Sequence, residues 1–381
     1  MRTEAPYEKL RPLLFSIAYR MVSTVSEAED IVQEAFLRIH RAEVGGEKIE
    51  SPKAYLSAVV TRLSIDHLRS ARVRREQYVG QWLPEPLLTD PEPDAAAQAE
   101  TADSLSMAFL VLLESLTPVE RAVFLLREVF DYDYGEIAKI VERSEDNCRQ
   151  LYVRARRHID EGRPRFEASR QQRDELAQRF LAAAQQGDTE ALIELLAADV
   201  VVYGDGGGKA PSWPQPIYGR ERVAKLMAGT FAQALLVGAS VQPTQLNGQP
   251  GLSFVDHEGR IGAVMSLEIA DGVIQTIRGV TNPDKLAHLG AVADVRAILR
   301  QGRTERWPGS RPSVTESARS FAATLSSSCT TALSAFNDDR LTTRARTPAT
   351  SATSRSNEFG GHSPWSRNAT SRRTSSSSYT L

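Results

Sequence analysis

Arginine and amide side chains gather on one face of a helix predicted near residue 150. At 3.6 residues per turn, Cys148, Ala155 and Ile159 fall on one side of this helix, and mainly polar side chains fall on the other. Guanidinium and amide groups are the ones that bond to base edges and phosphates in the major groove of DNA. The alternative is a helical hairpin with a solvated basic face. The second side holds Asp146, Arg149, Gln150, Val153, Arg154 and Arg157.

Two helix-start signals place this helix in a helix-turn-helix. In "TPVE" and "DYGE", Thr117 and Asp133 each stand three residues before a glutamate, Glu120 and Glu136, which is the pattern of a capping box. The short helix after Asp133 ends at the right distance before the arginine-bearing helix. The sequence therefore predicts a helical module over residues 104–166.

A second cluster of arginines lies on a helix predicted to begin with Ser51 as N-cap and Pro52 as its first residue. Asp66 lies among these arginines, where it either forms surface ion pairs or orients them toward nucleic acid. Tyr55, near the start of the helix, either stacks on an unpaired base or packs at the rim of a core. The arginines are Arg62, Arg69, Arg72, Arg74 and Arg75.

The preceding helix, within "SEAEDIVQEAFLRIH", has two different faces. Ser26 and Glu29 form a capping-box pattern, and Val32 and Phe36 belong to an apolar stripe. The other stripe sets one leucine among acids, which is typical of a docking face for a basic partner helix, although a solvated face is the alternative. Its members are Asp30, Gln33, Glu34 and Leu37.

The remaining chain divides by composition. Residues 77–103 form a linker in which four prolines prevent a continuous helix, and no Lys or Arg occurs between Gln77 and Glu120. Residues 170–295 read as two helices broken at Gly187, followed by a run of antiparallel strands, which favours an α+β domain. Residues 303–381 are predicted to be a disordered tail, because Ser and Thr supply 31 of the last 81 residues without a sustained apolar period.

The predicted strands lie near 237–246, 251–257, 260–270 and 273–281, with Asp271–Gly272 as a hairpin turn.

Charge and composition limit the classes of function. The net charge is −2, so a DNA-binding role requires positive charge in local stripes. Two cysteines are too few for a disulfide framework, and Cys148 is predicted to be a buried apolar residue. The sequence has no apolar run long enough to span a membrane and no signal-peptide core, so we expect a cytoplasmic protein without a membrane partner.

In this order, the modules resemble the extracytoplasmic-function (ECF) sigma factors of bacterial RNA polymerase. The resemblance covers residues 7–166. It depends on "EAEDIVQEAFLRIH…YLSAVVTRLSIDHLR" and "LTPVERAVFLLREVFDYDYGEIAKIVERSEDNCRQLYVRARR". It implies that residues 7–76 are sigma region 2, that residues 104–166 are sigma region 4, and that core polymerase and promoter DNA are the partners.

The resemblance also implies roles for individual residues. Core-polymerase binding falls to Asp30, Gln33, Glu34, Phe36 and Leu37. Contact with the -10 element falls to Tyr55, Arg62, Asp66, Arg69, Arg72 and Arg74. Contact with the -35 element falls to Asn147, Arg149, Gln150, Arg154, Arg156 and Arg157.

Two residues depart from the pattern of the family. Tyr55 stands where a Trp is usual, which bears on base stacking during promoter melting. Glu142 stands in the turn where a Gly is usual, which bears on the strain of that turn or the position of the helix.

Residues 170–295 resemble the SnoaL-like domains, a cone-shaped α+β fold that some sigma factors of this family carry as an extension. "WLPEP" (82–86), "DGGGK" (205–209) and "NPDKL" (282–286) look like signatures of that subgroup. In the subgroup, the extension is thought to control the sigma domains in cis. The residues expected in a regulatory contact are Trp82, Asp205, Lys209, Asn282, Asp284 and Lys285.

The predicted fold is therefore multidomain, with two all-α sigma modules, a SnoaL-like domain and a disordered tail. One alternative function is a one-component regulator that binds a small ligand of unknown identity in the cone domain. Another is an enzyme domain that uses Asp205, Asp256 or His257 for acid–base chemistry. The "DGGGK" loop is a flexible loop, an intramolecular contact or, more weakly, a phosphate site. No catalytic set, metal ligands or cofactor is predicted.

Overall fold

The computed structural model describes residues 7–89, 104–162 and 169–304, and their side chains apart from those of residues 71–76, 162 and 301–304. The second part of the linker, residues 90–103, and the predicted tail from residue 305 onward lie outside the described residues.

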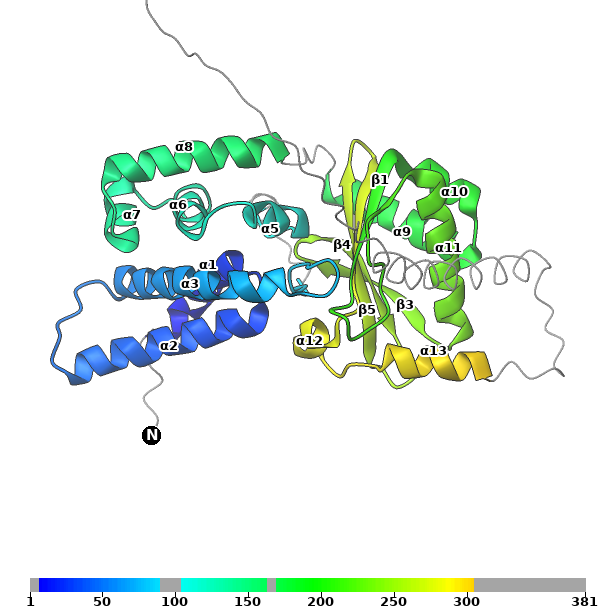
Figure 1. Cartoon of the computed structure of the whole chain (residues 1–381), viewed down its shortest axis with the longest axis horizontal. Helices are drawn as coiled ribbons and strands as arrows, with labels where there is room; N and C mark the ends of the chain where they lie inside the picture. Colours follow the sequence, from blue (N-terminus) through cyan, green and yellow to red (C-terminus); the bar gives the residue numbers. More distant parts are fainter. Residues whose placement is uncertain (1–6, 90–103, 163–168, 305–381) are drawn as a thin grey trace, which may run out of the picture. The chain divides into compact units, whose positions relative to one another are not determined.

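The two predicted all-α modules are confirmed, and they share one apolar core. Tyr19 of the first module and Phe124 of the second are both buried in this core. The helices of the first module are η1 (Glu8–Leu10), α1 (Arg11–Val22), α2 (Val25–Val44) and α3 (Pro52–Glu76) (Figure 1). Those of the second are α5 (Met107–Leu113), α6 (Pro118–Glu128), α7 (Tyr134–Val141) and α8 (Glu145–Gly162).

A buried arginine connects the two modules. Arg121 in α6 is 2 % exposed, donates a hydrogen bond to the carbonyl oxygen of Met21, and pairs with Glu114 at 2.6 Å. Burial lowers the pKa of Arg121 to about 9, but its carboxylate partner and its carbonyl acceptor compensate the buried charge.

Helix starts follow the predicted capping residues with one exception. Thr117 and Asp133 both form complete capping boxes, and the Ser51 hydroxyl accepts a hydrogen bond from the Ala54 N–H at 3.3 Å. The predicted capping box at Ser26 is wrong, because α2 begins at Val25 and Thr24 occupies the N-cap position without a side-chain cap bond.

The α+β domain is confirmed as a six-stranded sheet that packs against helices. Its helices are α9 (Arg170–Gln186), α10 (Thr189–Leu195), α11 (Arg220–Leu236), α12 (Pro283–Leu286), η2 (Ala287–Leu289) and α13 (Val295–Thr304). Its strands are β1 (Leu196–Asp205), β2 (Ile217–Tyr218), β3 (Ser240–Leu246), β4 (Gln249–Val255), β5 (Ile261–Ala270) and β6 (Val273–Val280). The strand order is β2-β1-β6-β5-β4-β3, and among these neighbours only β1 and β6 run parallel.

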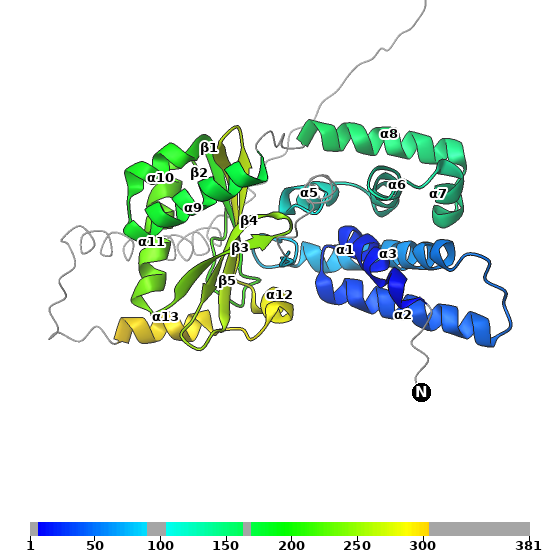
Figure 2. The ribbon, with the colours of Figure 1, turned by 180° about the vertical axis from the view of Figure 1, so that it is seen from behind.

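The two faces of the sheet pack against different partners. Met265 and Leu267 face α9, α10 and α11, which cover one side of the sheet in both Figure 1 and Figure 2. Val264 points to the other face, because side chains alternate along a strand, and clusters there with Leu83 of the linker and Leu286 of α12. The domain therefore buries one face under α9, α10 and α11, while α12 and the linker pack against the other.

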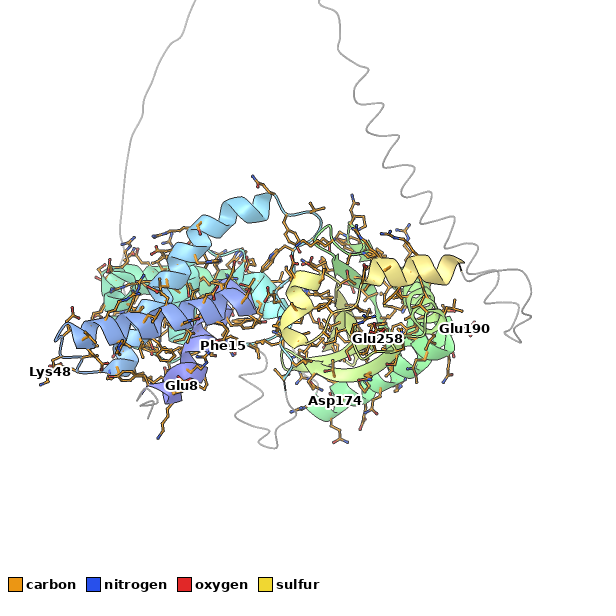
Figure 3. All side chains as sticks on the ribbon, turned by 90° about the horizontal axis from the view of Figure 1, so that it is seen from below. Glu8, Phe15, Lys48, Asp174, Glu190 and Glu258 are labelled. Atoms are coloured by element: carbon orange, nitrogen blue, oxygen red, sulfur yellow. The ribbon has the colours of Figure 1, made fainter. Side chains whose placement is uncertain are left out.

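Hairpin turns link the antiparallel strands. Asp271 and Gly272 have φ values of 52° and 72°, as the predicted turn between β5 and β6 requires. Asn247 and Gly248 form a similar turn between β3 and β4, with φ values of 53° and 72°. In Figure 3, Asp174 marks the start of α9, where its carboxylate accepts a hydrogen bond from Gln245 of β3 at 2.8 Å.

Candidate functional site

The outer face of α2 presents the acids and the leucine expected to bind a partner. Asp30, Gln33 and Leu37 are exposed, Leu37 to 44 %. Glu34 accepts a hydrogen bond from Arg38 at 2.8 Å, and this bond lowers the pKa of the Glu34 carboxyl. Phe36 is half-buried and packs against the helical core, so it supports this face from beneath.

A shallow groove runs beside this face, between α2 and α3. Among the residues that line it are Asp30, Glu34, Leu63 and Asp66. The groove is therefore acidic along its edges and apolar in part, which suits a partner helix that is basic and partly apolar.

On α3, the residues expected to contact DNA differ in their burial and in their bonding partners. Tyr55 is half-buried against the helical core, and Arg69 pairs with Asp66 at 3.3 Å. Arg62 donates hydrogen bonds to the carbonyl oxygens of Ile140 and Lys139, at 2.9 and 2.8 Å. The side chains of Arg72 and Arg74 lie outside the described residues.

Arg62 therefore contacts the C-terminal end of α7. The carbonyl groups in the last turn of a helix have no partner within the helix, and a guanidinium group satisfies them well. Arg62 also lies 3.3 Å from a carboxylate oxygen of Glu142. Glu142 itself has φ 55° and ψ 53°, the left-handed conformation for which a glycine is usual.

The helix α8 has the two faces that its sequence predicts. Cys148, Ala155 and Ile159 are buried at 1 % exposure or less. Most of the residues expected to bind DNA are exposed, and Asn147 is half-buried. The exposed residues expected to bind DNA are Arg149, Gln150, Arg154, Arg156 and Arg157.

Several arginines of α8 are held by neighbouring acids. Arg149 lies 3.0 Å from Glu145 and rests over the ring of Tyr134, with 5.0 Å between its guanidinium carbon and the ring centroid. Arg157 pairs with Glu161 at 3.1 Å while 83 % of its side chain stays exposed. Exposed pairs of this kind contribute only a few tenths of a kcal/mol, so a phosphate or a base can replace the acid at little cost.

The other polar site joins the linker to the SnoaL-like domain. Asp205, at the end of β1, is fully buried and accepts a hydrogen bond from Lys285 at 2.8 Å and one from the backbone N–H of Leu83 at 2.9 Å. The phenol of Tyr78 also donates to Asp205, and burial together with this neighbouring carboxylate raises the pKa of Tyr78. The Lys285 ammonium lies 4.3 Å from the centroid of the Trp82 ring.

The remaining residues of the expected regulatory contact lie around the pair formed by Asp205 and Lys285. Lys209 forms an ion pair with Asp284. Asn282 donates a hydrogen bond to the Tyr78 phenol at 2.8 Å. A Cβ atom on Gly207 would lie 2.3 Å from the amide nitrogen of Asn282, so the glycines permit the loop to approach its neighbours. The structure thus brings together all six residues expected here.

Comparison with known proteins gives the family. Residues 6–74 match the family model of Sigma-70 region 2, and residues 106–159 match that of Sigma-70 region 4. The ECF RNA polymerase sigma factor SigJ of Mycobacterium tuberculosis is 35% identical over 289 residues, which cover 73% of this chain and 91% of the relative. This chain belongs to the ECF RNA polymerase sigma factors.

Two further comparisons extend over the same length. The probable ECF RNA polymerase sigma factor SigI of M. tuberculosis is 33% identical over 290 residues, covering 75% of this chain and 96% of the relative. The crystal structure of M. tuberculosis SigJ aligns with a TM-score of 0.59 at 32% identity, covering 74% of this chain and 97% of that one. The likeness therefore includes the SnoaL-like domain, and it favours a sigma factor over a one-component regulator.

The residues expected for acid–base chemistry in this ECF sigma factor have other partners. Asp256 accepts hydrogen bonds from the N–H groups of Glu258 and Arg260, both at 2.9 Å, and from the Arg260 guanidinium, so it braces its own turn. His257 is exposed and lies 3.6 Å from Glu258. Asp205 is enclosed by the linker.

Three residues of the sigma factor make contacts that were not predicted. Asn247 is fully buried and bonds through its side chain to Tyr19 at 2.8 Å and to Leu87 at 2.9 Å. Glu85 of the linker accepts a hydrogen bond from the Val25 N–H of α2, and the His288 ring lies 2.7 Å from the carbonyl oxygen of Pro86 in the linker. The sequence shows the Asn247–Gly248 pair and the glutamate of "WLPEP". It does not show what they contact, because their partners lie far away along the chain.

None of the helices in the described part of the sigma factor combines the length and apolar character that crossing a bilayer requires. Nor do three or more His, Cys, Asp or Glu side chains gather as ligands for a metal ion among the described residues.

Proposed function

We propose that this ECF sigma factor directs RNA polymerase core enzyme to promoters that carry -35 and -10 elements, and that its SnoaL-like domain regulates it in cis. The role is that of a polymerase subunit, not of an enzyme in its own right. Because bacterial transcription takes place in the cytoplasm, the proposal places the chain there.

The outer face of α2 is the proposed site for core polymerase. Asp30, Glu34 and Leu37 combine acidic side chains with a large exposed apolar one. A basic helix with an apolar stripe complements this combination, since charge steers the encounter and the leucine provides apolar contact.

The proposed DNA contacts are on α3 and α8. Arg149 and Arg157 on α8 are exposed and paired with surface carboxylates, and Arg149 also rests over the Tyr134 ring, so both are available for bases and phosphates of the -35 element. Tyr55, Arg62 and Arg69 on α3 are proposed for the -10 element, where an aromatic ring and cations favour unstacked bases.

The observation that carries the regulatory part of the proposal is the buried Asp205. Its carboxylate accepts the Leu83 N–H, and Lys285 donates to the carbonyl oxygen of Leu83 as well. The SnoaL-like domain thus holds the linker on which the two DNA-binding modules depend for their separation.

Run-off transcription with purified core polymerase tests the proposal. The full chain and a chain that ends at residue 169 are compared on a promoter selected with the full chain. We expect transcription from both, with a different yield for the shorter chain. Equal yields contradict regulation in cis, and no specific transcript from either chain contradicts the sigma-factor role.

A further inference from the structure

The first turn of α2 has no cap of its own. Thr24 has the extended conformation of an N-cap residue, with φ −131° and ψ 139°, but its side chain makes no cap bond. Its hydroxyl instead donates to the side chain of Glu27. Since the first N–H groups of a helix have no partner within the helix, α2 needs an acceptor from elsewhere.

Glu85, in the linker, supplies that acceptor. Its carboxylate oxygen Oε2 accepts a hydrogen bond from the Val25 N–H at 2.6 Å. The backbone N–H groups of Val25 and Ser26 both favour the ionised form of this carboxylate. A carboxylate is a good acceptor at a helix N-terminus because its charge also favours the positive end of the helix dipole. Glu85 lies 60 residues after Val25 in the sequence.

The backbone of Glu85 is also bonded to the first helical module. Its N–H donates to the carbonyl oxygen of Ser23 at 2.9 Å, and its carbonyl oxygen accepts a hydrogen bond from the Tyr19 phenol at 2.6 Å. Glu85 is only 7 % exposed. The carboxylate therefore has little freedom to leave the helix unless the linker moves.

The SnoaL-like domain holds the linker from the other side. The His288 ring nitrogen Nε2 lies 2.7 Å from the carbonyl oxygen of Pro86, and its Nδ1 lies 3.9 Å from the Glu85 carboxylate. Asn247 contacts both Leu87 and Tyr19, as described above. Pro86 and Leu87, which follow Glu85 in the linker, are thus anchored to the domain, as is Leu83 before it, through Asp205 and Lys285.

From these contacts we infer that Glu85 is a positioning residue for the polymerase-binding face of α2, and that the SnoaL-like domain keeps it in place. The face begins at Asp30, little more than one turn after the capped residue Val25. Fraying of the first turn would displace the start of the face. This inference rests on the proposed binding of core polymerase by α2, and it adds a route by which the domain acts on that binding.

Amide hydrogen exchange in the full chain tests the cap itself. Glu85→Ala should speed exchange in the segment 23–29 about fivefold, the effect of losing a typical N-cap. Glu85→Gln keeps an acceptor without the charge and should give a smaller increase. The matched control is Glu47→Ala, which removes an exposed glutamate in the loop after α2 and should leave this segment unchanged. Unchanged exchange in Glu85→Ala overturns the inference.

His288→Ala tests the part played by the domain. The substitution leaves α2 and Glu85 intact, so faster exchange in segment 23–29 requires that the domain holds the cap. The same rate as in the native chain shows that the linker holds Glu85 unaided, which contradicts the inference.

Binding to core polymerase tests the positioning role. Glu85→Ala should raise the dissociation constant several-fold, Glu85→Gln less, and Glu47→Ala not at all. Faster exchange together with unchanged affinity limits Glu85 to a structural cap and overturns its positioning role. If the native chain fails to bind polymerase, the proposed function fails, while the exchange results still decide whether Glu85 caps α2.

Discussion

Arg62 of α3 and Ile140 of α7 are joined by a hydrogen bond of 2.9 Å from the guanidinium Nε to the carbonyl oxygen. The arginine proposed for the -10 element thus serves as a cap for the first helix of the helix-turn-helix. Its Nε and one of its two Nη groups are committed to α7, so a bidentate contact of Arg62 with DNA competes with this cap.

Replacement of Arg62 should affect both contacts. Arg62→Ala should accelerate amide exchange at the C-terminal end of α7 and lower the affinity of the polymerase complex for DNA with an open -10 element. Arg220→Ala, which removes an exposed arginine of α11, should change neither DNA affinity nor exchange in α7. Unchanged DNA affinity in Arg62→Ala would refute the role of Arg62 at the -10 element.

The left-handed conformation of Glu142 gives a prediction about stability. For a residue with a side chain this conformation costs about 1–2 kcal/mol, whereas the exposed pair with Arg62 contributes only a few tenths. Glu142→Gly should therefore raise the free energy of unfolding by about 1 kcal/mol, measured by urea denaturation. At the neighbouring Arg143, which does not have a positive φ, replacement by Gly should lower it. A destabilised Glu142→Gly variant would mean that the ion pair outweighs the strain.

Arg149 is proposed to read the -35 element. Arg149→Ala should weaken binding to that element by about 1–3 kcal/mol if the guanidinium group forms a bidentate contact with a guanine. Arg143→Ala removes an arginine from the preceding turn and should cause a smaller, sequence-independent loss. Fluorescence anisotropy with matched and scrambled -35 DNA measures both. An equal loss on the two DNAs in Arg149→Ala would assign Arg149 to the phosphates instead.

Asp205 should be the residue on which docking of the linker depends most. Asp205→Ala leaves Lys285 buried without its carboxylate, and breaking a buried pair of this kind costs about 3–5 kcal/mol. We expect fast amide exchange at Leu83, whose N–H donates to Asp205. Asp256→Ala is the matched control, since that carboxylate braces only its own turn. Protection of Leu83 that survives in Asp205→Ala would show that other contacts hold the linker.

His288 predicts a dependence of stability on pH. Burial lowers its pKa below the ordinary 6.5, so the unfolded chain takes up the proton first as the pH falls. The contribution of His288 to the free energy of unfolding is thus complete above pH 6.5 and is lost as the pH falls through its folded-state pKa. Glu85 acts in the opposite direction. Burial raises its pKa above 4.5, so its ionisation costs stability as the pH rises from 4.5 through its folded-state pKa.

Urea denaturation between pH 4 and 7.5 separates the two groups. The His288→Gln variant should lose less stability than the native chain when the pH falls below 6.5. The Glu85→Gln variant should lose more as the pH falls toward 4.5, since the carboxyl that takes up a proton in the folded chain is absent. Identical pH profiles for the native chain and His288→Gln would contradict the assignment.

Local features of the chain were predictable where local interactions determine them. The capping boxes at Thr117 and Asp133 involve residues three apart, and the burial of Cys148 follows from helical periodicity. The start of α2 was misplaced because its acceptor, Glu85, comes from the linker. The strand β1 was not predicted, since it follows α10 directly without a turn signal.

The site residues show the same division. Residue type and spacing identified the exposed faces of α2 and α8, and the resemblance to the sigma factors brought Asp205, Lys285 and Trp82 together. Asn247 escaped notice because a turn asparagine is ordinarily exposed, and only the folded chain shows it fully buried against Tyr19 and Leu87.

The central claim is that the acidic face of α2 attaches this chain to RNA polymerase, and binding to purified core enzyme tests it most directly. The native chain should bind, while the double variant Asp30→Lys and Glu34→Lys should keep its fold and lose that binding. Equal binding by the two proteins, or no binding by the native chain, would contradict the claim.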